Sequence, residues 1–417
     1  MNENARSVVL FTGLSHAIVH TFELSIPILV VIWLLEFPVS TATLGLVVGA
    51  GYALFGIGAL PGGVLADRYG SRALILACLA GMGGAFLLLS FATGVVTIAI
   101  ALGLWGIAAS VYHPSGLSLI STGVEDRGTA FAYHGMAGNV GIALGPLVTA
   151  LLLVTFDWRI VTRLLVVPAA VAIAYAVTAE FDETAAVSVD GGTDQSMSPA
   201  KFVADSRALF TAGFGLAMLV VMMNGLFYRG TLTFLPDVLG TVLPPVSDVI
   251  QLFERGSPLA SEFDLSSYLY VGLLAVGIGG QYVGGRVSDR IEPTTGLAVV
   301  FGSLVVVAAG FIPAARAGLL PLLVASAVLG FLLFALQPLY QATIADHSPP
   351  DDRGLSYGYT YLTSFGVGAA GAAIAGYLLS VVSADGTFLA LAVFPALGAI
   401  FAVVLGRWGD DDGDGAA

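Results

Sequence analysis

The chain has 417 residues, of which 57% are hydrophobic and only 10% are charged. A soluble domain carries about 25% charged residues, so this composition excludes an ordinary soluble protein. The formal net charge is −13, from 15 basic and 28 acidic residues, and this balance argues against nucleic-acid binding.

Apolar stretches of about 20 residues, each long enough to cross a bilayer, follow one another along the chain. They predict an all-α polytopic membrane protein with twelve transmembrane helices. In chain order the stretches cover residues 8–35, 43–66, 73–91, 94–120, 129–154, 159–179, 208–236, 268–288, 295–314, 318–345, 355–382 and 386–406. The start MNENAR is too acidic, and the run after it too long, for a cleaved signal peptide, so we expect the first stretch to remain as a helix.

The first stretch contains SHAIVHTFEL (15–24), which places titratable groups inside an apolar run. Steps of four and three residues put His16, His20 and Glu23 on one helical face. Ionisable residues within a membrane mark substrate or proton pathways, and buried carboxylates and histidines exchange protons near neutral pH. We therefore expect a site for proton and substrate here. The alternative is three polar groups that only hydrogen-bond one another inside a bundle.

A charged loop, GGVLADRYGSR (62–72), follows the second stretch. The carboxylate of Asp67 can accept hydrogen bonds at a neighbouring helix N-terminus, where the helix dipole favours an anion. Arg68 and Arg72 suit an anionic cytoplasmic leaflet. We expect this loop, with Gly63 and Gly70, either to make such a contact or to be a charged turn that only satisfies the positive-inside rule.

Polar and small residues also mark the fourth and fifth stretches. Pro114 is expected to kink its helix, because proline removes one backbone hydrogen bond, and His113 beside it faces a cavity or packs. In the fifth stretch a stripe of small residues permits close approach between helices. The stripe consists of His134, Gly138, Gly141 and Gly145, with Pro146 directly after it.

The second half of the chain has fewer charged groups within its apolar stretches. Arg229 follows Asn224, and we expect it either to contact a substrate or to pair with Glu23 across a cavity. Arg163, near the outer end of the sixth stretch, is expected to reach the interface. The complete predicted site for proton coupling and substrate is Glu23, His20, His16, His113, Asn224, Arg229, Gln337 and Gln341.

Three motifs recur in the same order at near-constant spacing. Asp67-Arg68 recurs as Asp289-Arg290, His113-Pro114 as Gln337-Pro338, and EDRG (125–128) as DDRG (351–354). The repeat predicts two pseudo-symmetric six-helix bundles, an architecture of secondary transporters. The predicted domains are the N-terminal bundle 1–180, a cytoplasmic linker 181–206, the C-terminal bundle 207–407 and an acidic cytoplasmic tail 408–417.

The positions of Arg and Lys set the expected orientation. With a cytoplasmic N-terminus, ten of the 15 basic residues fall inside, so we expect a plasma-membrane protein with both termini in the cytoplasm. The polar loop 236–267 would then lie outside. The acidic linker and tail would face solvent, and they favour a halophilic protein because acidic surfaces stay hydrated at high salt.

The loop Gly63-Val-Leu-Ala-Asp67-Arg68-Tyr-Gly70-Ser-Arg72 resembles the loop between helices 2 and 3 of the major facilitator superfamily, and Asp289-Arg290 lies where that family has a degenerate copy. The resemblance implies the major facilitator fold. It implies that this loop is a conformational latch, in which Asp67 contacts helix 11 and holds the outward-facing state. It also implies a weaker role for Asp289, because Ile-Glu-Pro (291–293) departs from the pattern. Asp-Trp-Arg (157–159) is a further feature of that family.

Two shorter resemblances concern the direction of transport. Gly-Ile-Ala-Leu-Gly-Pro (141–146) resembles a glycine–proline motif of antiporters. Ser-His (15–16), His-Pro (113–114) and Gly-Asn (138–139) are similar to fosmidomycin-resistance-type efflux proteins. These resemblances imply efflux.

The sequence therefore favours a secondary active transporter, and within this class a proton-coupled exporter of a drug-like, small polar or anionic solute. One alternative is ion-coupled uptake of a small organic anion or sugar, with Arg229 and Arg163 as anion ligands. An alternative of another class is a receptor or sensor that transports nothing.

Several features argue against other chemistry. The only lysine, Lys201, lies in the linker, and neither a GxxxxGK[ST] phosphate loop nor an HExxH motif occurs, so we expect no enzyme. Cys78 is the only cysteine and the five histidines are scattered along the chain, so we expect no metal site and no cofactor. The expected partners are a small-molecule substrate, protons or another coupling ion, and the lipid bilayer, and we expect a monomer.

Overall fold

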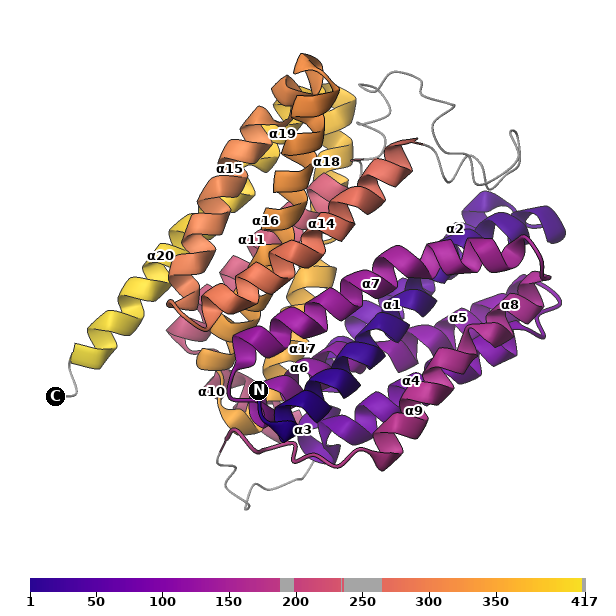
Figure 1. Ribbon diagram of the computed structural model, residues 1–417, viewed down its shortest axis with the longest axis horizontal. Helices are drawn as coiled ribbons and strands as arrows, with labels where there is room; N and C mark the ends of the chain where they lie inside the picture. The colour runs from indigo at the N-terminus through magenta and orange to yellow at the C-terminus, as the bar shows by residue number, and fades with distance from the viewer. Residues whose placement is uncertain (188–198, 234, 236–264, 415–417) are drawn as a thin grey trace. The chain divides into compact units, whose positions relative to one another are not determined.

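A computed structural model describes residues 1–187, 199–233, 235 and 265–414 (Figure 1). Every regular element in these ranges is a helix, which confirms the predicted all-α fold class. The predicted outer loop 236–267 lies outside the described residues up to residue 264. Residues 188–198 of the predicted linker and 415–417 of the predicted tail also lie outside them.

The chain divides into two compact units, and each unit contains a short segment from the other half of the sequence. Unit 1 comprises Met1–Glu125, Tyr133–Gln195 and Pro350–Tyr361. Its helices are α1 (Glu3–Glu36), α2 (Thr41–Ile57), α3 (Ala59–Tyr69), α4 (Ser71–Leu89), α5 (Val95–Ser110), α6 (Tyr112–Gly123), most of α7 (Arg127–Leu153), α8 (Trp158–Leu164), α9 (Val166–Thr178) and α17 (Arg353–Tyr361), with the 3-10 turn η1 (Pro350–Asp352) before α17.

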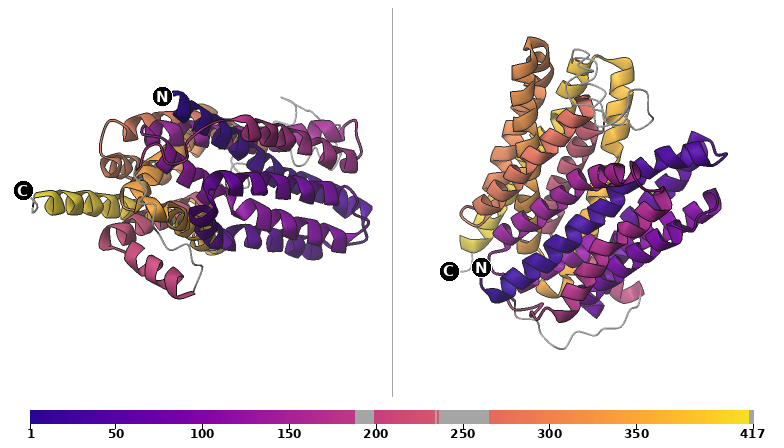
Figure 2. Two further views of the ribbon diagram at one scale, coloured as in Figure 1. Left: turned by 90° about the horizontal axis from the view of Figure 1, so that it is seen from below. Right: turned by 45° about the vertical axis from the view of Figure 1, so that its right-hand side comes forward.

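Unit 2 comprises Asp126–Ala132, which is the first six residues of α7 and the residue before them, together with Ser196–Pro349 and Leu362–Ala417. Its helices are α10 (Pro199–Leu209), α11 (Ala212–Leu232), α14 (Leu265–Ser288), α15 (Pro293–Ala317), α16 (Leu319–Asp346), the π-helix η2 (Leu362–Val367), α18 (Ala370–Val381), α19 (Ala384–Leu391) and α20 (Val393–Asp414). Within each unit the helices lie side by side, as α15 and α16 do in Figure 1 and in both views of Figure 2.

All twelve predicted membrane stretches coincide with helices. Within the described ranges, ten helical spans are long and apolar enough to cross a membrane, or eleven if α2 and α3, bent by 43°, form one span. The predicted stretch 268–288 coincides with α14, which is not among these spans. The protein is therefore a multi-pass membrane protein.

Polar side chains fix several helix beginnings. Asn2, Ser40, Thr211 and Ser383 each accept a hydrogen bond from a backbone N–H in the first turn of the following helix, which satisfies a donor that the helix itself leaves free. Gly70 ends α3 with a φ of 82°, a left-handed conformation that glycine adopts without strain. This turn places Asp67 and Arg72 at the ends of successive helices.

Pro114, where a kink is predicted, and Pro338, its counterpart in the repeat, differ in the structure. The fourth predicted helix is divided at Val111, so Pro114 lies in the first turn of α6, where a proline costs no helical hydrogen bond. In contrast, α16 continues through Pro338. The break at Val111 directs Tyr112 and His113 from the beginning of α6 into the interior of unit 1, where both are buried.

Helix α1 lies inside unit 1, in contact with α2, α4, α6 and α9. Half of its 34 residues are buried, including polar ones that a lipid-facing helix would not carry. Large apolar side chains such as Phe11, Phe22 and Trp33 fill the space around it. The position of α1 explains how its polar face can form a buried site in an otherwise apolar unit.

Candidate functional site

Asp67, at the end of α3, accepts hydrogen bonds from two backbone N–H groups at the beginning of α17. The donors are Gly354 N, 2.6 Å from Oδ1, and Leu355 N, 2.8 Å from Oδ2. Gly63, one turn earlier on α3, packs so closely that a Cβ there would overlap the Gly354 carbonyl. A carboxylate therefore binds a helix N-terminus, the position that the helix dipole favours for an anion.

Asp289, just after α14, makes the equivalent contact at the beginning of α7. Its carboxylate accepts from Gly128 N at 2.9 Å, from Thr129 N at 2.8 Å and from the Thr129 hydroxyl. A Cβ on Gly285 would overlap the Gly128 carbonyl. The Ile-Glu-Pro sequence after Arg290 does not remove this contact, and Asp289 accepts one hydrogen bond more than Asp67.

The donors of both contacts come from a motif that sequence reasoning recognised only as a repeat. Gly128 ends EDRG and Gly354 ends DDRG, so each Asp-Arg motif binds the helix start supplied by the [ED]DRG motif of the other half of the sequence. The recurrence of both motifs in the same order was the sequence signal that could have indicated these contacts. We call these contacts the Asp67 clasp and the Asp289 clasp.

Replacing Asp67 by Asn is expected to loosen α17 selectively. Hydrogen bonds to a charged acceptor are worth about 1.5–3 kcal/mol, and an amide can accept only one of the two. We expect the backbone amides of Gly354 and Leu355 to exchange with deuterium roughly 10- to 100-fold faster, as measured by mass spectrometry of peptides covering 350–361.

The matched control for this measurement is Asp289→Asn. It should accelerate exchange at 126–132 and leave 350–361 unchanged. Equal acceleration of both segments in either variant would show general loosening, and it would contradict the assignment of two separate clasps.

Glu23, His20 and His16 form a chain of hydrogen bonds along α1. His20 Nδ1 lies 2.6 Å from Glu23 Oε2, and His20 Nε2 lies 3.0 Å from His16 Nε2. His16 Nδ1 lies 2.8 Å from the backbone oxygen of His134 on α7. All three residues on α1 are at most 9% exposed. The predicted helical face thus becomes a continuous buried chain that ends on a neighbouring helix.

The geometry of this chain requires one shared proton. A carbonyl oxygen only accepts, so His16 Nδ1 donates to His134 O, and Nε2 of a neutral His16 then carries a lone pair. An ionised Glu23 also only accepts, so the neutral His20 donates from Nδ1 and has a lone pair on Nε2. Two lone pairs 3.0 Å apart cannot bond. One further proton completes the chain. It can lie on either imidazole, or it can lie on Glu23 while His20 takes the other tautomer, with its proton on Nε2.

Two further histidines join this chain from other helices. His113 on α6 packs edge-on against His16 with ring centroids 5.2 Å apart, and its ring lies 4.3 Å from that of Tyr361 on α17. His134 stacks on His16 with centroids 3.9 Å apart. Four of the five histidines of the chain therefore gather within unit 1. Sequence reasoning placed His134 only in a packing stripe.

Tyr112 fixes the tautomer of His134. Its hydroxyl donates to the Thr12 carbonyl and lies 3.2 Å from His134 Nε2, so Nε2 carries the proton and donates to the hydroxyl oxygen. The Nδ1 atom of His134 has no hydrogen-bond partner among the described residues. Tyr112 was missed because an aromatic residue beside a helix break has no distinctive sequence pattern.

The predicted glycine stripe of α7 lies directly against α1. A Cβ on Gly138 would meet the His16 ring, one on Gly141 would overlap the Ala17 backbone, and one on Gly145 would come within 2.8 Å of Thr21 Cα. Pro146 lies inside α7 without ending the helix. This close approach brings the His134 carbonyl to His16.

The predicted site residues of the second half all lie in unit 2. Asn224 on α11 is buried, and its Oδ1 has no partner among the described residues. Arg229 stacks its guanidinium over Phe365, 5.0 Å from the ring centroid. Gln337 on α16 accepts a hydrogen bond from Gln281 Nε2 at 2.6 Å, and Gln341 is buried one turn later.

Gln281 is a polar residue that sequence reasoning missed. It is 1% exposed on α14, and its Oε1 has no partner among the described residues. The available signal was an amide in the middle of the apolar run 272–285. The hypothesis that Arg229 pairs with Glu23 stays a prediction.

The predicted cations of the first half of the sequence contact other groups of unit 1. Arg163 donates to Ser90 Oγ at 3.0 Å and stacks on Phe91. Arg68 stacks on Tyr69, and Arg72 donates to the Ala176 carbonyl. These side chains therefore anchor helix ends.

The predicted linker begins with a contact that sequence reasoning missed. Glu183 accepts from Ser71 N at 2.8 Å and from Arg72 N at 3.2 Å, at the beginning of α4. Its carboxylate therefore binds the helix N-terminus that follows the predicted latch loop.

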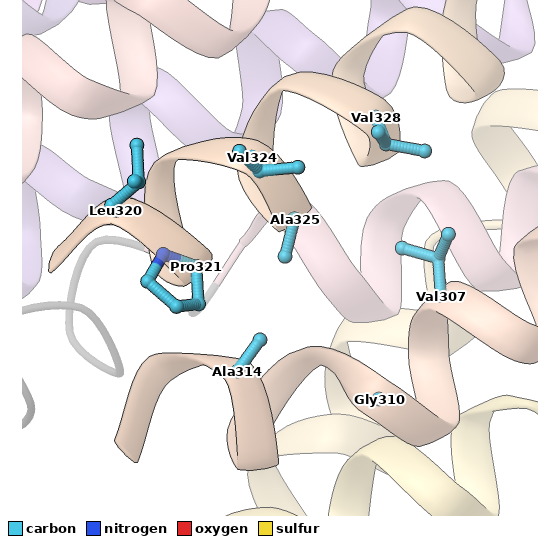
Figure 3. Close-up of a pocket in the computed structure, with 8 residues that line it drawn as sticks. All are labelled: Val307, Gly310, Ala314, Leu320, Pro321, Val324, Ala325 and Val328. Atoms are coloured by element: carbon cyan, nitrogen blue, oxygen red, sulfur yellow. The ribbon is translucent and has the colours of Figure 1, made fainter. Parts of the chain in front are cut away.

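Two other features bear on what the protein can bind. His16, His20 and His113 each offer a ring nitrogen within 4.8 Å of the others, although the histidines are scattered in sequence. A hollow between α15 and α16, in contrast, is lined by apolar residues alone, among them Gly310, Leu320 and Val324 (Figure 3). The buried polar groups described above therefore lie around α1 in unit 1 and around α11, α14 and α16 in unit 2.

Residues 10–370 match a family of known proteins, the Major Facilitator Superfamily. Over 315 residues the chain is 26% identical to the uncharacterized MFS-type transporter YfnC of Bacillus subtilis (strain 168), a match that covers 74% of this chain and 71% of that protein. A shorter match is 36% identical over 103 residues, and it covers 24% of this chain and 20% of the puromycin resistance protein pur8 of Streptomyces alboniger.

Two solved structures share the fold. The human organic anion transporter MFSD10 (TETRAN) superposes with a TM-score of 0.70 at 16% identity, covering 96% of this chain and 100% of that one. The proton:xylose symporter XylE, bound to 6-bromo-6-deoxy-D-glucose, superposes with a TM-score of 0.69 at 15% identity, covering 95% of each chain. At these identities the likeness concerns the fold alone.

Proposed function

The chain belongs to the Major Facilitator Superfamily, and from this premise we propose that it is a secondary active transporter that exports a small molecule in exchange for protons. It would work by alternating access as a monomer in the plasma membrane, with both termini in the cytoplasm. The substrate class would be a drug-like, small polar or anionic solute.

The hydrogen-bond chain of Glu23, His20 and His16 is the observation that carries this proposal. It lies in the interior of unit 1, and its geometry needs one proton more than an ionised Glu23 and two neutral imidazoles provide. With that proton the cluster has no net charge, so it can stay buried without a large desolvation cost. Without it, two lone pairs and a carboxylate face one another, which favours rearrangement or the binding of another group.

The two clasps support alternating access. Asp67 binds the start of α17, and Asp289 binds the start of α7, each through backbone N–H groups alone or with one hydroxyl. Such contacts form or break as whole units, because a carboxylate either meets a helix N-terminus or returns to water. Matching contacts from the two repeats suit a cytoplasmic gate with two latches. Glu183 accepts hydrogen bonds at the beginning of α4, and this contact suits a fixed anchor for the linker.

The name of one relative supports export. The short match to the puromycin resistance protein covers a quarter of this chain, so drugs of that kind belong in the first panel of substrates. The glycine stripe of α7 and its proline also suit an antiporter. Uptake of a small organic anion is the second candidate. Arg229 could contact an anion in unit 2, and Asn224 Oδ1, which has no partner within the described ranges, could contact a hydroxyl group.

The test is transport by the purified chain in liposomes with an imposed pH gradient. The panel contains puromycin, phosphonates, sugars, organic acids and lipophilic cations, and the buffer contains high salt to suit the acidic surface and a chelator to remove metal ions. We expect at least one compound to move against its concentration gradient while protons move the opposite way.

The outcomes separate the candidate functions. Substrate movement in the same direction as protons would support symport and contradict export. Movement that is unaffected by the pH gradient would contradict proton coupling. A panel that binds but never crosses the bilayer would favour a receptor.

A further inference from the structure

We propose that His16, His20 and His113 form a binding site for one divalent transition-metal ion of the Zn²⁺ and Co²⁺ kind. The three side chains are buried, and each offers a ring nitrogen within 4.8 Å of the other two. The proposal concerns equilibrium binding, and it stands whether or not the protein couples transport to protons.

The distances suit a single ion. At zinc–nitrogen distances of about 2.0–2.1 Å, two ligand nitrogens in a tetrahedral site lie about 3.3 Å apart. His16 Nε2 and His20 Nε2 are already 3.0 Å apart, so an ion between them requires only a small separation of the rings. His113 approaches both rings from α6, with centroids 5.2 Å from His16 and 5.5 Å from His20. It completes a three-nitrogen face by a side-chain adjustment.

The outer contacts of two of these histidines match those of metal ligands. A metal-binding imidazole usually donates its second N–H to a backbone carbonyl or a carboxylate, which fixes the tautomer and orients the ring. His16 donates from Nδ1 to the His134 carbonyl, and His20 donates from Nδ1 to Glu23. Both rings therefore present an Nε2 lone pair to the same point, where an ion would replace the shared proton.

The ligand type restricts which ions can bind at this site. Three neutral imidazoles suit Zn²⁺, Co²⁺, Ni²⁺ or Cu²⁺ and disfavour Mg²⁺ and Ca²⁺, which prefer oxygen. The Glu23 carboxylate on His20 offsets part of the ion's charge in this buried position. With three protein ligands a tetrahedral ion keeps one position open, for water or for a group on a bound solute.

The test is a titration of the full-length, chelator-treated protein with Co²⁺, followed by its visible absorption. We expect one equivalent of Co²⁺ to give the intense bands of a tetrahedral site and Zn²⁺ to abolish them. His16→Ala, His20→Ala and His113→Ala should each weaken binding more than about 100-fold. Glu23→Gln should cost about 10- to 100-fold, as the loss of an outer contact usually does.

Two histidine variants serve as matched controls. His347 lies in unit 2, where its Nδ1 bonds the Thr343 carbonyl, and His347→Ala should leave Co²⁺ affinity unchanged. His134→Phe keeps the backbone carbonyl that orients His16, and it should also retain the site. Where an alanine variant does not fold, glutamine replaces it, and X-ray absorption of the Zn²⁺-loaded wild type counts the imidazole ligands directly.

Either of two results would overturn the site. One is Co²⁺ or Zn²⁺ binding that survives loss of all three histidines, which would assign the ion to the acidic segments of the sequence. The other is the absence of one-to-one binding in the folded wild type. Metal binding without proton-coupled transport would contradict the proposed function alone, and proton-coupled transport without metal binding would contradict this inference alone.

Discussion

Replacing Glu23 by Gln is expected to abolish the dependence of substrate transport on the pH gradient. The amide cannot take up or release a proton, so the chain through His20 to His16 loses the group that balances its shared proton. In a coupled wild type, proton binding typically changes the affinity for substrate by a factor of about 5 to 150. In the variant this factor should be about 1, which means no coupling. The measurement compares substrate affinity and counterflow at two pH values in liposomes, with a chelator present throughout.

The control is Glu36→Gln, the same chemical change at the last residue of α1. Glu36 accepts from Arg159 at 2.7 Å and from the Trp158 indole, and its side chain is 35% exposed. This variant should keep its response to pH. If Glu23→Gln keeps that response as well, the proton does not pass through the α1 chain and the proposed coupling is wrong.

Replacing Gly141 by Ala is expected to lower the stability of the protein. A Cβ at this position would overlap the Ala17 carbonyl and lie 2.8 Å from its carbon, so α7 and α1 must separate. Overpacking of this kind costs about 1–3 kcal/mol. Separation would also draw the His134 carbonyl away from His16. We expect a lower unfolding midpoint in detergent and weaker Co²⁺ binding in the same variant.

The matched control is Gly84→Ala on α4, where an added Cβ has no neighbour within 4 Å. Alanine is the better helix former by up to about 1 kcal/mol, so this variant should be as stable as the wild type or slightly more stable. A fall in the unfolding midpoint of equal size in both variants would show that glycine matters here for helix flexibility rather than for close packing.

Most of the fold follows from the sequence. Apolar stretches of membrane length give the position of every predicted helix, because the bilayer requires continuous hydrogen-bonded apolar segments. The sequence pattern does not show that α17 belongs to unit 1 or that the beginning of α7 (Asp126–Ala132) belongs to unit 2. Contact between a carboxylate and backbone N–H groups far along the chain depends on tertiary packing, and the [ED]DRG motifs show it only as a repeat.

The candidate site could be predicted within one helix but not between helices. Residue spacing places His16, His20 and Glu23 on one face, and the structure joins them in one chain. His113 and His134 reach the same point because a break before Tyr112 and a glycine stripe on α7 bring other helices close to α1. Spacing along one helix predicts neither the break before Tyr112 nor the close approach of α7 to α1. The prediction of no metal site considered only how far apart the histidines lie in the sequence.

The π-helix has a consequence for which changes this protein can tolerate. Tyr361 belongs to unit 1 and Leu362 to unit 2, so the boundary between units falls where the helix widens from α to π, with Gly368 N donating to Thr363 O over five residues. A π-turn holds one residue more than the α-turn it replaces. Deleting a single residue from 362–367 would therefore restore an ordinary α-turn and leave the helix after it in the same rotational position. Gly371 would still face Leu226, whose carbonyl leaves no room for a Cβ, so the chain can lose the extra residue of the π-turn more readily than it can replace this glycine.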